Sequence, residues 1–149
     1  MAPITVSKHI GAAVGTVFER FTAVESSPAR VSGIKAIEML TTGPFGLGSR
    51  WRETREVLGH LDTAEMEVTA YERNKTYTIS HHKMGARIDT IFTFTPAEGG
   101  TDVDIEFSLR GPGMPPGLLA PIEWAIAARV REVLSHDLAD LANAAMPDK

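Results

Sequence analysis

The sequence predicts an α+β domain in which a curved, seven-stranded antiparallel sheet wraps around one long C-terminal helix. Three observations predict this architecture. Apolar and polar residues alternate through most of residues 34–110, which is typical of strands with one buried face. Glycine, proline and asparagine recur between these runs and suit short turns. After residue 117 the apolar period changes from two residues to that of a helix.

The N-terminal part predicts one strand followed by two short helices. Residues 4–10 alternate apolar and polar side chains, as a strand does. Residues 12–24 place valines and phenylalanines at helical spacing. Two serines before Pro28 supply a cap and a first-turn proline for a second helix over 27–32, which Gly33 ends.

Six further strands and the long helix follow. The strands are expected at 34–43, 47–58, 61–72, 75–84, 86–96 and 101–110. The regular helix should begin near residue 120, because Pro121 is tolerated only in the first turn. About 25 helical residues extend close to 40 Å. Such a helix covers only part of the concave side of a seven-stranded sheet, so a cavity is expected between them.

Composition excludes several classes of function. The chain has 149 residues and a net charge of −4, and it has no basic block, which argues against a nucleic-acid partner. The absence of cysteine excludes disulfides and thiol chemistry. No apolar run approaches the roughly 20 residues of a membrane helix, so membrane insertion is not expected. We expect a single domain over 1–149 in a cytoplasmic protein.

The stretch Ser-Arg-Trp-Arg-Glu-Thr-Arg-Glu at 49–56 predicts a polar patch inside the cavity. In a strand, Trp51 shares a face with Glu53 and Arg55, and the opposite face is the more polar one. Trp51 should therefore face inward, and Glu53 and Arg55 should follow it. Two opposite charges two positions apart can pair, which offsets much of the cost of burial. They form either an ordinary ion pair or a ligand-contacting, acid/base pair.

Alternation in the other strands predicts the remaining lining. In 61–72 the alternate residues Ala64, Met66, Val68 and Ala70 should face inward. In 75–83 the inward face carries His81, which is a candidate general base or a core residue, and His82 should face outward. The predicted ligand-contacting set comprises Trp51, Met66, Val68, Tyr77, Ile79, Phe92, Phe94, Phe107, Ile122, Ile126 and Val130.

Three features outside this set also need an interpretation. Phe45 and Met114, in glycine- and proline-rich loops, are expected at the cavity mouth. Asp137 falls within the apolar stripe of the last helix and needs a partner, such as Arg55 or Arg87, or solvent. Trp124 falls on the opposite side of that helix, where an aromatic residue suits an interface, including that of a homodimer. No spacing of histidines suits a metal site, and no cofactor is expected.

Four segments carry a resemblance to a known family: GPFGLGSRWRE at 43–53, IFTFTP at 91–96, GGTDVDIEF at 99–107 and VREVLSHDLADLAN at 130–143. In this order they resemble the polyketide cyclase/dehydrase-like branch of the START/Bet v 1-like (SRPBCC) superfamily. The resemblance covers essentially the whole chain and implies the helix-grip fold with a deep apolar cavity. It implies ligands such as lipids, hormones, secondary metabolites or polyketide intermediates. No catalytic motif of the family matches residue by residue.

Three functions remain open from the sequence. The first is binding of a small, largely hydrophobic ligand whose polar end is oriented by Glu53, Arg55 and His81. The second is a cofactor-independent cyclase or dehydratase, in which Glu53 or His81 moves a proton and Arg55 stabilises an enolate oxygen. The third is a protein-interaction module that uses the Trp124 side of the helix. The first is favoured, because the sequence contains a cavity pattern but no proton-transfer pair of defined spacing.

Overall fold

The computed structural model describes residues 3–57, 59–83, 85–111 and 120–145. Its elements are, in chain order, β1 (Ile4–Ile10), α1 (Val14–Thr22), the 3-10 turn η1 (Val24–Ser26), α2 (Ser27–Arg30), β2 (Ile34–Met39), β3 (Arg50–Val57), β4 (His60–Glu72), β5 (Thr76–Lys83), β6 (Ala86–Ala97), β7 (Gly100–Arg110) and α3 (Ala120–Ala145). The helix-grip prediction, with a curved antiparallel sheet and a long last helix, is confirmed.

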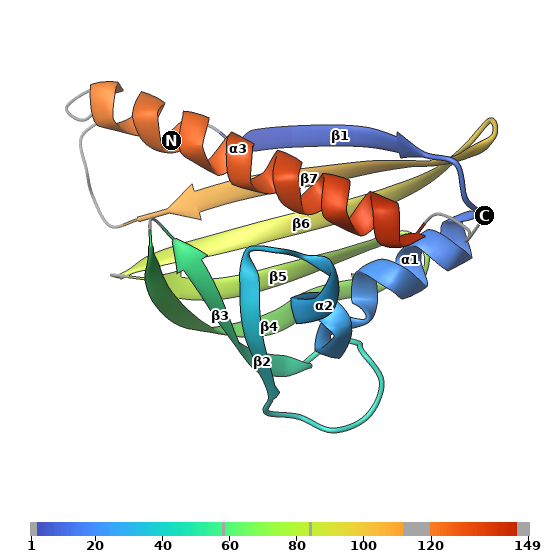
Figure 1. Ribbon diagram of the computed structural model, residues 1–149, viewed down its shortest axis with the longest axis horizontal. Coiled ribbons are helices and arrows are strands. Elements are labelled where there is room, and N and C mark those ends of the chain that lie inside the picture. The colour runs from blue at the N-terminus through green and yellow to red at the C-terminus, as the bar shows by residue number, and fades with distance from the viewer. Residues whose placement is uncertain (1–2, 58, 84, 112–119, 146–149) are drawn as a thin grey trace.

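The seven strands form one antiparallel sheet in the order β1-β7-β6-β5-β4-β3-β2. Strands β2 to β7 therefore form a meander, and β1 is the edge strand that pairs with β7. Figure 1 shows α1, α2 and α3 on the same face of this sheet. The inward side chains of the strands and the helices enclose the core between them. None of the helices that the structure describes has the length and hydrophobicity needed to cross a membrane.

The Gly-Gly-Thr motif at 99–101, where β7 begins, makes close backbone contact with the end of β1. Gly99 has a φ of 77°, a left-handed conformation that favours glycine. A β-carbon on Gly100 would lie 2.0 Å from the carbonyl oxygen of Ile10, so no side chain fits there. Next to it, the buried Thr101 donates a 2.8 Å hydrogen bond from its hydroxyl to the carbonyl oxygen of Ala12. This motif thus fixes where the chain leaves β1.

Helix α3 is held at both edges of the sheet by different forces. Its C-terminal half contacts β1 and α1, where Leu134, Leu138, Ala142 and Ala145 are buried. Towards the β2–β3 edge the attachment is polar: Asp137 pairs with Arg55 of β3, and Asp140 accepts hydrogen bonds from Ser32. Residues 125, 126, 128 and 129, nearer the start of the helix, are exposed.

A bulge in β4 corrects one sequence-based prediction. The pairing of β4 with β5 shifts register between Val68 and Ala70, so the alternation of faces changes there. Ala70, expected to face inward, is exposed. Tyr71 packs inward in its place, with its ring centroid 5.9 Å from that of Phe18. A bulge adds one residue to one strand, and simple alternation cannot place it.

Candidate functional site

A cavity of about 340 Å³ lies between the concave side of the sheet and the helices. Its volume falls in the range of about 300–1,000 Å³ that is common for small-molecule sites. The wall is predominantly apolar and comes from α1, η1, α2, β2 to β7 and α3. The apolar lining residues are Phe21, Val24, Val31, Ile34, Trp51, Ala64, Met66, Tyr77, Ile79, Phe92, Ile105, Phe107, Val130, Val133, Leu134 and Leu141.

Aromatic rings form one wall of the cavity. Tyr77 and Phe92, paired across β5 and β6, stack with centroids 4.5 Å apart and an interplanar angle of 17°. Phe21 of α1 meets the edge of Phe92 at 6.4 Å. Burial raises the pKa of the Tyr77 hydroxyl well above its usual value, so the phenol stays protonated. This wall offers flat apolar surface to a ligand.

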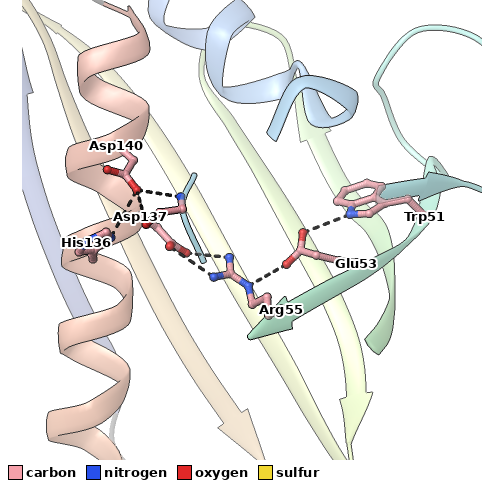
Figure 2. A network of polar contacts seen from close by, with 7 residues as sticks. Trp51, Glu53, Arg55, His136, Asp137 and Asp140 are labelled. Carbon is pink, nitrogen blue, oxygen red and sulfur yellow. Dashed lines mark hydrogen bonds and ion pairs between the residues drawn. The ribbon is translucent and has the colours of Figure 1, made fainter. Parts of the chain in front are cut away.

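A chain of polar contacts crosses the cavity from β3 to α3 (Figure 2). The indole N–H of Trp51 donates to Glu53 at 3.4 Å, and Arg55 Nε donates to the other oxygen of Glu53 at 2.9 Å. Arg55 then donates through Nη1 and Nη2 to the two oxygens of Asp137, at 3.3 and 2.7 Å. Gly33 leaves room for this fork, because a β-carbon there would lie 3.3 Å from Arg55 Nη1. One cation thus serves two carboxylates.

The pKa shifts in this chain reflect the shared cation. Burial opposes the charge of Arg55, but Asp137 and Glu53 together raise the pKa of its guanidinium above the usual value. For Asp137, burial raises the carboxyl pKa, the nearby Glu53 adds to that effect, and Arg55 offsets it only in part. Both directions follow from one cation facing two carboxylates in a poorly hydrated place.

His81 projects into the same cavity from β5. Burial lowers the pKa of its imidazole below the usual value, against the opposing influence of Glu53. The ring is therefore neutral near pH 7. Its Nδ1 is buried, and no residue in the described part of the chain gives that atom a hydrogen bond. We use the name polar patch for Glu53, Arg55, His81 and Asp137.

Two half-exposed basic residues at the rim of the cavity form ion pairs with carboxylates outside the polar patch. Lys83 pairs with Asp62, and Arg129 pairs with Glu132 at 3.4 Å. About half of each cationic side chain is exposed, 49 % for Lys83 and 48 % for Arg129. Within the described ranges, no three His, Asp or Glu side chains gather as a metal site would require.

The Arg55–Asp137 pair also borders a second hollow, of about 520 Å³. Although this hollow is larger, most of the residues around it have polar or charged side chains, among them Ser32, Glu56, Glu132, Ser135 and His136. A small-molecule site is usually lined mainly by apolar groups. The first cavity is therefore the candidate site, and the ion pair stands between the two hollows.

Most of the residues that the sequence indicated do line the cavity. They are Trp51, Glu53, Arg55, Met66, Tyr77, Ile79, His81, Phe92, Phe107 and Val130. The pairing of Glu53 with Arg55, and of Asp137 with Arg55, is also present. These residues share one property: strand or helix periodicity alone directs them inward.

Four of the indicated residues lie elsewhere. Val68 and Phe94 are buried but do not line the cavity; Phe94 packs against Phe18 and Phe21 of α1 instead. Ile126 is 43 % exposed. Phe45, expected at the mouth, packs against the rings of Trp51, Tyr71 and Tyr77. Met114 and the side chains of Ile122 and Trp124 lie outside the described residues.

Several lining residues were not predicted from the sequence. Ser27 lies in α2 and Val31 follows it, and Asp62 and Lys83 come from β4 and β5. The strand residues lie on the inward face of their strands, so the alternation of side chains along each strand could have predicted them. Ser27 and Val31 carried no such signal, because only the tertiary packing brings α2 to the cavity.

Comparison with known proteins agrees with this fold. A family model described as polyketide cyclase/dehydrase and lipid transport matches residues 1–145. No curated protein sequence matches the chain. The chain is similar to the crystal structure of TTHA0849 from Thermus thermophilus, with a TM-score of 0.79, 14 % identity and 97 % of each chain covered.

Two further solved structures are similar. One is the di-domain ARO/CYC BexL from the BE-7585A biosynthetic pathway, with a TM-score of 0.81 and 12 % identity over 99 % of this chain and 51 % of that one. The other is major latex-like protein 151 from Panax ginseng, with a TM-score of 0.76, 12 % identity and 98 % of each chain covered. At these identities the likeness concerns the fold.

Proposed function

Because the chain belongs to the polyketide cyclase/dehydrase and lipid transport family, we propose that it binds a small, largely hydrophobic molecule in the cavity between sheet and α3. The ligand would be of lipid, polyketide or secondary-metabolite type. The observation that supports this most directly is the cavity of about 340 Å³, with apolar walls and a few convergent polar groups. The aromatic wall at Tyr77 and Phe92 would hold the apolar body, and the polar patch would orient one end.

A cavity-filling substitution tests this proposal. Ala64 lines the cavity, whereas its neighbour Thr63 is exposed on the opposite face of β4. We expect Ala64→Phe to abolish the fluorescence enhancement of 1-N-phenylnaphthylamine, because the new ring occupies the space the probe needs. Thr63→Phe is the matched control and should bind the probe as the wild type does. Unchanged binding by a folded Ala64→Phe variant would contradict a ligand in this cavity. Native mass spectrometry of the purified protein would reveal a retained hydrophobic molecule.

A second candidate function, a cofactor-independent cyclase or dehydratase, is favoured by the state of His81. His81 lines the cavity, and a neutral imidazole there can take a proton from a carbon next to a carbonyl. Both oxygens of Glu53 already accept hydrogen bonds, from Trp51 and Arg55, so His81 is the better base of the two. Arg55 would face the developing enolate oxygen.

The enzyme hypothesis predicts a specific loss of rate. With a poly-β-ketone thioester mimic as substrate, His81→Gln should lower kcat by about 10²–10⁴-fold, the usual contribution of a general base. Binding of 1-N-phenylnaphthylamine should persist in this variant. If the wild type binds such mimics but leaves them unchanged over the background rate, binding without catalysis is the function.

A further inference from the structure

The charge of the polar patch is unbalanced. Glu53 and Asp137 bring two negative charges, Arg55 brings one positive charge, and the imidazole of His81 is neutral near pH 7. The side chains of Glu53, Asp137 and Arg55 are only 11 %, 13 % and 26 % exposed, so water screens them weakly. An anionic group entering the patch would meet net repulsion.

The hydrogen-bonding capacity of the polar patch also disfavours an anionic ligand group. Arg55 has five N–H donors, and Nε, Nη1 and Nη2 each already donate one to a carboxylate. Each carboxylate has about four acceptor positions. Glu53 accepts from Trp51 and Arg55, and Asp137 accepts twice from Arg55. More acceptor than donor capacity therefore remains, which suits a ligand group that donates.

Other cations do not restore the balance. Lys83 and Arg129, the remaining basic residues of the described lining, lie at the rim and face Asp62 and Glu132. The sequence contains no Lys, Arg or His over residues 112–124. A carboxylate placed in the polar patch would thus meet Arg55 as the one cation of the patch, and that cation is already shared by Glu53 and Asp137.

We infer that the polar end of the ligand is an uncharged or cationic hydrogen-bond donor, such as a hydroxyl or amine, and that the cavity rejects carboxylates. This inference rests on the proposed binding function and narrows its ligand class. Free fatty acids are then poor ligands, whereas alcohols, phenols and amines with the same apolar body are good ones. The apolar body occupies the aromatic wall, and the donor faces Glu53, Asp137 and the ring of His81.

A set of probes with one apolar body tests this directly. Calorimetric titration at pH 7.5 would compare 2-naphthalenemethanol, 2-naphthoate and 2-methylnaphthalene. We expect the alcohol to bind at least about tenfold more tightly than the carboxylate, because like charges repel strongly in a poorly hydrated site. The hydrocarbon reports whether the cavity accepts the body at all.

Variants assign the selectivity to the patch. Asp137→Asn removes one negative charge, and the affinity ratio of alcohol to carboxylate should fall by about tenfold. Glu53→Gln should lower the same ratio and serves if the first variant does not fold. Glu65→Gln, on the exposed outer face of β4, changes the total charge equally and should leave the ratio as in the wild type.

The outcomes separate this inference from the function beneath it. If 2-naphthoate binds the wild type as tightly as the alcohol, or more tightly, the inference fails and the binding function stands. An equal change of ratio in Glu65→Gln would also overturn it, because overall charge would then be the cause. If none of the three probes binds, both the inference and the proposed binding function fail.

Discussion

Arg55 is the residue on which the charge balance of the cavity depends. Replacing it with leucine leaves Glu53 and Asp137 facing an apolar space without a cation. We expect Arg55→Leu to lower the free energy of unfolding by about 3–5 kcal/mol at pH 7.5, as is typical of breaking a buried ion pair. Asp137→Asn keeps a balanced pair between Arg55 and Glu53 and should cost only about 1–2 kcal/mol. Urea unfolding followed by tryptophan fluorescence measures both.

The pH dependence of the leucine variant provides a control. Burial already raises the pKa of the Asp137 carboxyl, and without Arg55 that pKa should rise further above its value in the unfolded chain. When the pKa of a carboxyl is higher in the folded than in the unfolded chain, the free energy of unfolding falls as pH rises through the folded pKa. The difference in free energy of unfolding between wild type and Arg55→Leu should therefore be largest near neutral pH and smaller near pH 5. A deficit of equal size at both pH values would show that lost packing, rather than charge, explains the effect.

His81 makes a second residue-scale prediction about pH. Its folded pKa lies below the usual value of about 6.5, because burial disfavours the imidazolium. The unfolded chain therefore takes up a proton at a higher pH than the folded protein does. Stability should fall as pH drops from above 6.5 through the folded pKa. The free energy of unfolding of His81→Gln should decline less than that of the wild type between pH 8 and pH 5.5. Parallel curves for the two proteins would contradict a lowered pKa of His81 in the folded protein.

At the scale of elements, the two halves of α3 contribute differently. Leu138 is 2 % exposed among core residues, whereas Val130 faces the cavity. Leu138→Ala should lower the free energy of unfolding by about 2–5 kcal/mol, because it opens a void in a packed region. Val130→Ala removes a side chain that already borders empty space and should cost less than about 1.5 kcal/mol. Chemical denaturation of both variants checks this; equal costs would mean that the helix packs evenly.

The start of β7 allows another test at this scale. Gly100→Ala would place a methyl group against the backbone of Ile10, which cannot yield as a flexible side chain can. We expect a loss of about 2–3 kcal/mol. Gly46→Ala is the matched control, since a β-carbon there meets nothing within 4 Å. Thermal unfolding followed by circular dichroism measures both, and similar melting temperatures would contradict a close strand contact.

At the scale of the whole molecule, ligand binding should be linked to stability. A ligand that binds only the folded state, present at 100 times its Kd, adds about 2.7 kcal/mol to the free energy of unfolding. For a chain of this length the melting temperature should rise by roughly 5–10 °C. A thermal shift with 1-N-phenylnaphthylamine measures this. The shift should vanish in Ala64→Phe; its persistence there would mean that the probe binds outside the cavity.

Periodicity within single elements was enough to predict most of the fold and much of the site. The faces of Trp51, Glu53 and Arg55 follow from strand parity, which is a local property of the backbone. The requirement that a buried charge be paired predicts Arg55, Arg87 or solvent as the partner of Asp137. The structure has the pair with Arg55. The order of the elements likewise follows from the places where the period changes and turn residues occur.

Only the tertiary structure decided which inward residues border empty space. Val68 and Phe94 point inward as Met66 and Phe92 do, but they lie in the packed core, with α1 against Phe94. The bulge after Val68 also had no signature in the alternation. The physical reason is the same in each case: the face on which a strand residue lies depends on its neighbours along the chain. The boundary between core and cavity depends on where helices far apart in sequence come to rest against the sheet.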